Sequence, residues 1–173
     1  MNSKFLLGDS VFYHAAPIHW PKCLADLSIL RKEKLNIADS YKEIRISTSY
    51  RDFTFILLNS SLFFYYWIVF SDCYNLTKKY FSIGIPDIQD TSFGKEAARL
   101  NADLFDKMQI AVYSYKNRGF VRFAQFFPKK SKPIIDEIDK VLAAHYGFTD
   151  EELDFIINYD IKYRMGDELN SEE

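Results

Sequence analysis

Hydrophobic residues recur every three or four positions in two stretches of the chain, a spacing that predicts amphipathic helices. The first stretch spans residues 95–115, and the second spans residues 131–147, with a proline in its first turn and a glycine at its end. Directly afterwards, Thr149 and Glu152 have the spacing of a capping box, so a further helix is expected to end near Gly166. These last two helices form a helical hairpin.

Other stretches have the patterns of strands or of a buried helix. Residues 43–48 alternate polar and apolar side chains, and residues 9–14 and 120–127 concentrate aromatic and branched ones. We also expect a strand around Ile83. Residues 53–70 carry no charge, and we predict one long core helix from about position 50 to position 70.

The uncharged stretch 53–70 reaches the length at which a membrane-spanning helix must be considered. Its polar run at positions 59–61 and its neighbouring aromatic residues match hydrocarbon poorly, so we favour a core helix and expect no membrane association. Cys23 and Cys73 are far apart and lack a metal-binding or redox spacing. Reduced thiols of this kind indicate a cytoplasmic protein.

These elements together predict an α+β fold, with a small mixed sheet packed by two long helices and a C-terminal helical hairpin. The expected strands lie around Val11, Ile44, Ile83 and Phe120. A chain of 173 residues with 48% hydrophobic residues is long enough and apolar enough for one folded unit with a substantial core.

Charge is distributed unevenly along the chain. Residues 107–132 include seven basic and no acidic residues, whereas residues 133–173 include three basic and twelve acidic ones. Such a chain can present a cationic face to a polyanion, although ordinary solvated surfaces give the same pattern. Lysine and arginine bind phosphates, and arginine also reads guanine. The candidate nucleic-acid-binding residues are Lys116, Arg118, Arg122, Lys129, Lys130 and Lys132, with Lys78 and Lys79 as a second, smaller cationic point.

Residue patterns of catalytic, cofactor or metal sites are weak. The 6 glycines form no G-x-G fingerprint, and every proline is isolated. His14, His19 and Cys23 lack a fourth ligand at the spacing of a common zinc module. His145 lies at a predicted helix end, where a packing or capping role is favoured over that of a catalytic base. We therefore assign no catalytic, cofactor-binding or metal-binding residue.

Several segments carry a family resemblance. The C-terminal block Lys132-Pro-Ile-Ile-Asp-Glu-Ile-Asp-Lys-Val-Leu, continued by His145-Tyr-Gly-Phe-Thr-Asp-Glu-Glu-Leu, resembles the closing segment of large bacterial restriction-modification methylases of the Eco57I class. Ile56-Leu-Leu-Asn-Ser-Ser-Leu-Phe-Phe-Tyr-Tyr-Trp and Ile83-Gly-Ile-Pro are similar to the TaqI-like C-terminal specificity domain of such enzymes.

The resemblance implies a target-recognition region of an adenine-specific type II DNA methyltransferase. It divides the chain into an N-terminally truncated DNA specificity domain, residues 1–130, the C-terminal helical hairpin, residues 131–166, and an acidic disordered tail, residues 167–173. In the family, the loop for S-adenosylmethionine and the Asn-Pro-Pro-aromatic motif lie upstream, and neither occurs here. We therefore expect that this chain binds double-stranded DNA and holds no cofactor, while a methylase domain or subunit supplies S-adenosylmethionine chemistry.

The sequence is compatible with more than one arrangement of the protein. The chain is interpreted as a fragment or as a separate short subunit, and the open edge of a truncated sheet predicts pairing with a second copy as a homodimer. A rival interpretation is a protein-interaction module that docks on a methylase or nuclease subunit. A standalone enzyme is the least favoured interpretation, because it requires the chain to bind S-adenosylmethionine.

Overall fold

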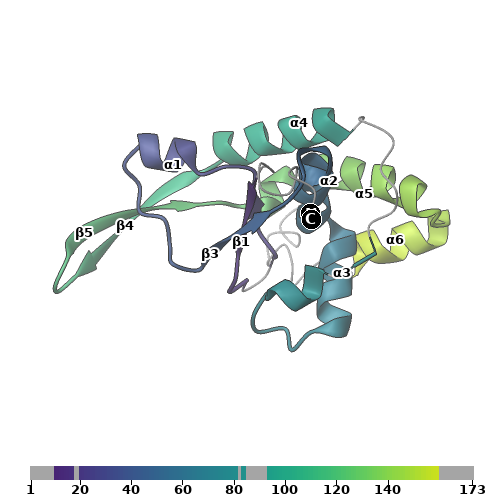
Figure 1. Ribbon diagram of the computed structural model, residues 1–173, viewed down its shortest axis with the longest axis horizontal. Coiled ribbons are helices and arrows are strands. Elements are labelled where there is room, and N and C mark those ends of the chain that lie inside the picture. The colour runs from purple at the N-terminus through teal and green to yellow at the C-terminus, as the bar shows by residue number, and fades with distance from the viewer. Residues whose placement is uncertain (1–9, 18–19, 82, 85–92, 160–173) are drawn as a thin grey trace, which may run out of the picture.

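The structure is a computed structural model that describes residues 10–17, 20–81, 83–84 and 93–159 (Figure 1). The predicted α+β class is confirmed, because helices and two small sheets are both present. The helices are α1 (Ser28–Lys32), α2 (Thr48–Asn59), α3 (Ser61–Phe70), α4 (Phe93–Asp106), α5 (Lys132–Tyr146) and α6 (Asp150–Asn158). Two one-turn 3-10 helices are η2 (Lys78–Phe81) and η3 (Pro128–Ser131).

The strands form two separate antiparallel sheets. One contains β1 (Ser10–His14), β2 (Cys23–Leu24) and β3 (Tyr41–Arg45) in the order β2-β1-β3. The other is a hairpin of β4 (Gln109–Tyr115) and β5 (Gly119–Gln125). The expected single sheet is therefore wrong. The Phe120 region pairs with β4 in the hairpin and with none of β1, β2 or β3, and Ile83 lies in a bend.

The long helix predicted between positions 50 and 70 is broken into α2 and α3, which meet at an angle of 70°. Ser60 is the cause, because its side chain donates to the carbonyl of Leu57 (2.6 Å) and accepts from the amide of Phe63 (3.1 Å). It thus ends one helix and caps the next. No single helix among the described residues is long and apolar enough to cross a membrane, although this bent pair reaches the length and composition.

The helix predicted for residues 95–115 ends at Asp106, and Gln109–Tyr115 is a strand instead. Its sequence, Gln-Ile-Ala-Val-Tyr-Ser-Tyr, is rich in branched and aromatic residues. Every residue from Gln109 to Tyr115 has a partner in β5, and this pairing overrides a spacing that also fits a helix. The sequence Asn117-Arg-Gly119 is typical of a turn, and the two strands are joined there by a turn at residues 116–118, followed by Gly119 at φ 65°.

The last two helices begin as the sequence predicts. Gly147 ends α5 in the left-handed conformation, and Thr149 and Glu152 form the predicted capping box of α6. However, α6 ends at Asn158 rather than near position 166, because Tyr159 leaves the helix with ψ at 118°. The predicted acidic tail, residues 167–173, lies outside the described residues.

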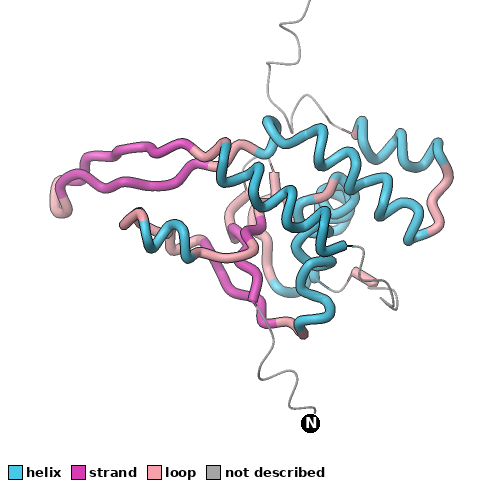
Figure 2. Tube along the Cα trace, turned by 90° about the horizontal axis from the view of Figure 1, so that it is seen from above, coloured by secondary structure: helices cyan, strands magenta, loops and turns pink. Residues whose placement is uncertain are grey.

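Helices make up most of the body beside the sheets (Figure 2), and α2 and α5 both contribute fully buried residues to the core. Ile135, Ile138 and Leu142 of α5 are fully buried, and α5 packs against α2, α3, α4 and α6. The buried Asp139 accepts a hydrogen bond from the amide of Ser61 (2.9 Å), so α5 also fixes the start of α3. This helical body leaves the β4–β5 hairpin outside the main core.

Candidate nucleic-acid interface

The β4–β5 hairpin, residues 109–125, projects from the helical body and is called the arm below (Figures 1 and 2). At its base, the rings of Phe105 and Phe126 pack edge to face with centroids 5.3 Å apart. Along its side, the amide of Asn36 donates to the carbonyl of Arg122 (2.8 Å), and Asn36 also forms a bridge with Phe123. The arm is therefore anchored to the body while its far end stays in solvent.

The two faces of the arm differ in chemistry, because successive strand residues point to opposite sides. The Tyr113 face has an internal brace: the rings of Tyr113 and Phe123 pack edge to face, and Gln125 donates to the Tyr113 hydroxyl (3.0 Å). The opposite side, called the Arg122 face, carries Ile110, Val112, Ser114, Phe120, Arg122 and Ala124. The brace contacts lie on the Tyr113 face, whereas Ile110, Val112, Ser114, Phe120 and Arg122 on the other face are exposed.

Three predicted cationic residues meet on the arm. Lys116 and Arg118 lie in the turn between the strands, and Arg122 lies on β5 opposite Val112. All three are exposed, and no acidic residue occurs between positions 107 and 132. The far half of the arm therefore carries positive charge without a neutralising carboxylate in its own sequence.

The basic residues that follow β5 have different surroundings. Lys129 and Lys130 lie on η3, where Lys130 Nζ is 5.0 Å from the centroid of the Phe127 ring. Lys107 Nζ donates to the Lys130 carbonyl and pairs with Asp103 at 2.8 Å, which fixes η3 against α4. Lys132 is an ion-pair partner of Asp136 on α5, and only 16% of its side chain is exposed. It is a weaker phosphate ligand than the arm residues because its charge already has a partner.

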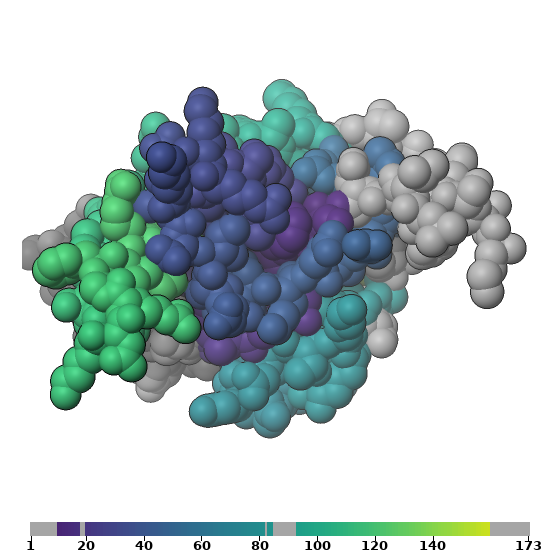
Figure 3. All heavy atoms as spheres, turned by 60° about the vertical axis from the view of Figure 1, so that its left-hand side comes forward, coloured from purple at the N-terminus to yellow at the C-terminus, as the bar shows by residue number. Residues whose placement is uncertain are grey.

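Lys78 and Lys79 do not join this surface. They are exposed on η2, where Lys79 Nζ lies 4.5 Å from the centroid of the Tyr80 ring, and Lys78 lines a shallow hollow with Glu43 and Arg45 of β3. Figure 3 shows the arm (green) and the segment that contains η2 (teal) on either side of the surface formed by α1 and β3. The eight predicted residues therefore fall into two separate groups.

The sequence interpretation missed a further group of cations on and after α1. Arg31, Lys32 and Lys34 are exposed there, and the chain then reaches Asn36, whose amide bonds to the arm. Figure 3 shows α1 (dark blue) next to the arm. The run Arg-Lys-Glu-Lys at positions 31–34 could have indicated these cations. It lies some eighty positions before the arm in sequence, and its glutamate lowers the net charge of the run, so it does not stand out. Folding places the two groups side by side and so enlarges the cationic surface.

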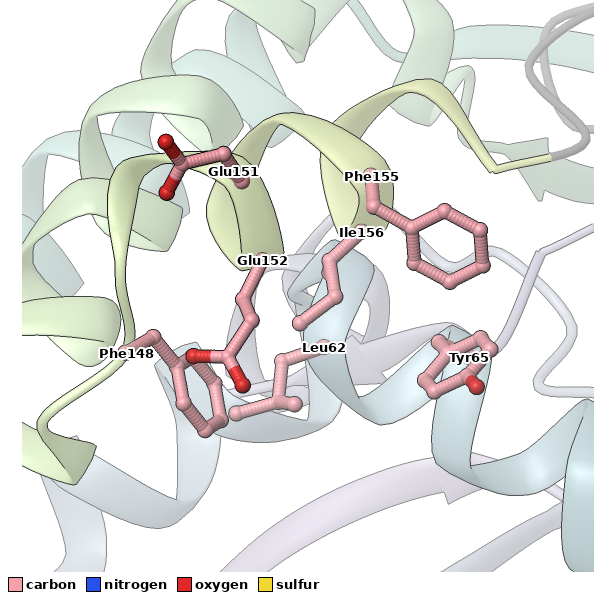
Figure 4. A pocket seen from close by; sticks show the side chains of 7 residues that line it. All are labelled: Leu62, Tyr65, Phe148, Glu151, Glu152, Phe155 and Ile156. Atoms are coloured by element: carbon pink, nitrogen blue, oxygen red, sulfur yellow. The ribbon is translucent and has the colours of Figure 1, made fainter.

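An apolar pocket between α3 and α6 is a second candidate site (Figure 4). It has a volume of about 410 Å³, and its lining includes Leu62, Tyr65, Phe148 and Phe155. Glu152 also lines it, but its carboxylate accepts from the Thr149 amide in the capping box. The Glu151 carboxylate points away from the apolar residues in Figure 4. This pocket therefore suits an apolar surface better than acid–base chemistry.

The two described residues of the weak metal pattern have structural roles. His14 Nε2 is hydrogen-bonded to the Ser40 hydroxyl (2.8 Å), and burial raises the pKa of the Cys23 thiol, so that the thiolate is disfavoured. His19 lies outside the described residues. Among the residues that the structure describes, no group of three or more histidine, cysteine, aspartate or glutamate side chains is placed to hold a metal ion.

The chain matches no protein-family model, no curated protein and no solved structure. The shape and charge of the arm are therefore the main physical basis for a functional proposal.

Proposed function

We propose that this chain binds duplex DNA through the arm, and that it acts as the target-recognition region of an adenine-specific DNA methyltransferase whose methylase domain lies outside it. The observation that carries the DNA proposal is the projecting ribbon with Lys116, Arg118 and Arg122 exposed and no carboxylate along its length. The methylase assignment rests on the family resemblance of the C-terminal and central segments.

The shape of the arm fits a groove of duplex DNA. The major groove is about 12 Å wide and admits a two-stranded β-ribbon, and β-ribbon proteins also use the minor groove. Because one face of the arm is braced internally, the Arg122 face can approach the duplex without rearrangement. Arg118 and Arg122 then lie within reach of phosphates and base edges, the two kinds of group that arginine contacts most often.

The cations beside the arm complete the interface. Arg31, Lys32 and Lys34 flank it on one element, and Lys129 and Lys130 follow its second strand on another. Residues at such flanking positions contact the phosphate backbone, which supplies affinity and register rather than sequence choice. In the parent enzyme, this binding would position the target adenine for flipping into the pocket of the methylase domain.

Salt dependence of binding tests this proposal. Fluorescence anisotropy with a labelled duplex pool gives the binding constant at salt concentrations from about 50 to 200 mM. The slope of the logarithm of this constant against the logarithm of the salt concentration changes by about 0.9 for each phosphate that the chain neutralises. The double substitution Arg118→Ala and Arg122→Ala is expected to reduce the slope by about 1.8. Lys140→Ala is the matched control, because Lys140 is an exposed cation on α5, away from the arm. An equal slope for the wild type and the double variant would refute the role of the arm.

A protein-interaction module is the second candidate. It is favoured by the apolar pocket and by Phe155, which lines that pocket and is 53% exposed. In this case the α5–α6 hairpin would dock on a methylase or nuclease subunit, and the arm would have no ligand. Phe155→Glu would then abolish assembly with that subunit, and the wild-type chain would show no salt-dependent DNA binding in the anisotropy assay.

A further inference from the structure

Phe120 is the most exposed large hydrophobic residue among those that the structure describes, with 81% of its surface accessible. It follows Gly119, whose positive φ of 65° closes the turn at the end of the arm. Its partner across the ribbon is Ser114, a small residue that covers little of the ring. The benzyl group therefore stands nearly free in solvent at the end of the projection.

The position of Phe120 is not explained by packing within the chain. It lies on the Arg122 face, opposite to the side where Tyr113, Phe123 and Gln125 form the brace. An exposed benzyl group loses the free energy that its burial would provide. A phenylalanine at this position is therefore better explained by contact with a ligand than by stability of the fold.

The neighbours of Phe120 indicate the chemistry of that ligand. Lys116 and Arg118 precede it in the turn, and Arg122 is two residues further along the same face. Arginine and phenylalanine also occur often at protein–protein interfaces, but lysine is depleted there, and no carboxylate between positions 107 and 132 accompanies these cations. A phenyl ring flanked by these three cations suits a duplex, whose phosphates pair with the cations while an apolar side chain reaches the bases.

We infer that Phe120 is a wedge that inserts between neighbouring base pairs and partly unstacks them when the arm enters a groove. This inference rests on the proposed DNA binding and adds a specific deformation of the DNA. Proteins that insert apolar wedges kink and unwind the duplex, and an aromatic ring replaces part of the lost stacking. Local unstacking at the arm also lowers the cost of extruding a nearby base.

A topological assay with the full chain tests the wedge without knowledge of a target sequence. Closed-circular plasmid is relaxed by a topoisomerase in the presence of saturating protein, the protein is removed, and the linking number is read on a gel. Wild-type chain is expected to leave the plasmid negatively supercoiled, because inserted wedges unwind the duplex. Phe120→Ala is expected to lose this shift at equal saturation and to bind DNA about tenfold more weakly.

Two further variants separate insertion from other effects. Tyr115→Ala removes an aromatic ring at the same end of the arm but on the braced face, and it is expected to unwind DNA as the wild type does. Phe120→Trp is expected to retain unwinding, and the introduced indole should be quenched on binding DNA. The native Trp20 and Trp67 are buried and give a constant background.

The outcomes distinguish this inference from the proposed function. Salt-dependent binding with unwinding that Phe120→Ala preserves would overturn the wedge alone. Absence of any DNA binding by the wild type would overturn both. A self-association that Phe120→Ala abolishes in sedimentation, with unwinding unaffected, would assign the ring to contact between copies of the chain and would equally overturn the wedge.

Discussion

Replacement of Asn59 by alanine should destabilise the fold strongly, because this side chain connects the β2 edge strand to the end of α2. Asn59 is only 3% exposed. Its Oδ1 accepts from the Cys23 amide (3.1 Å), and its Nδ2 donates to the carbonyls of Cys23 (3.0 Å) and Phe55 (2.9 Å). The side chain thus pairs both backbone groups on the outer edge of β2, where the sheet provides no further strand.

The magnitude follows from the groups left behind. Alanine leaves the buried N–H and C=O of Cys23 without these partners, and each buried group that loses its hydrogen bond costs about 1–3 kcal/mol. The expected loss is therefore about 2–6 kcal/mol, a large part of the 5–15 kcal/mol by which a typical domain is stable. The carbonyl of Phe55 is affected less, because it lies within the helical hydrogen-bond ladder of α2.

Guanidinium chloride unfolding, followed by circular dichroism, measures this loss as a lower midpoint at an unchanged slope. Asn158→Ala is the matched control. Asn158 also lies at a helix C-terminus and also donates to a backbone carbonyl, that of Asp154, but it is exposed. Its replacement should change stability by no more than about 0.5 kcal/mol. A loss below about 1 kcal/mol for Asn59→Ala would refute the role given to this side chain.

Three further predictions concern the core, pH and the interface. Asp139→Ala removes the acceptor of the Ser61 amide and should cost about 1–3 kcal/mol in chemical unfolding, and Asp139→Asn, which retains an oxygen, should cost less. Burial, together with the charge of Lys22, lowers the pKa of His14 in the folded chain. As the pH falls below 6.5, His14 is therefore protonated in the unfolded chain before it is protonated in the folded chain, and this favours unfolding. Between pH 7 and pH 5 the wild type should therefore lose more thermal stability than His14→Gln, and equal losses would contradict this. Lys132→Ala should change the salt slope of DNA binding less than Lys116→Ala does, because Lys132 is paired with a carboxylate.

Local signals in the sequence correctly predicted the end of α5 and the start of α6. The capping box of Thr149 and Glu152 and the left-handed Gly147 act within a single turn, so neighbouring residues suffice to identify them. The break at Ser60 was missed although its polar neighbours were visible. It depends partly on Asp139, whose contact with the next residue joins positions 78 apart in sequence.

The arm was only half predicted. Its turn and second strand follow from Gly119 and the aromatic residues after it, but the first strand has apolar spacing that fits a helix as well. Only pairing across the hairpin decides between the two structures. The cations of α1 were missed for a similar reason, since the contact of Asn36 with Arg122 joins residues 86 positions apart.

Chemical-shift mapping of the full, isotope-labelled chain with an unlabelled duplex identifies the surface that contacts DNA. DNA binding through the arm should perturb amides along residues 112–122 and around Arg31 and Lys34, with little change in α6. Perturbations concentrated on α6 and the apolar pocket beside it, or no perturbation at low salt, would contradict DNA binding through the arm.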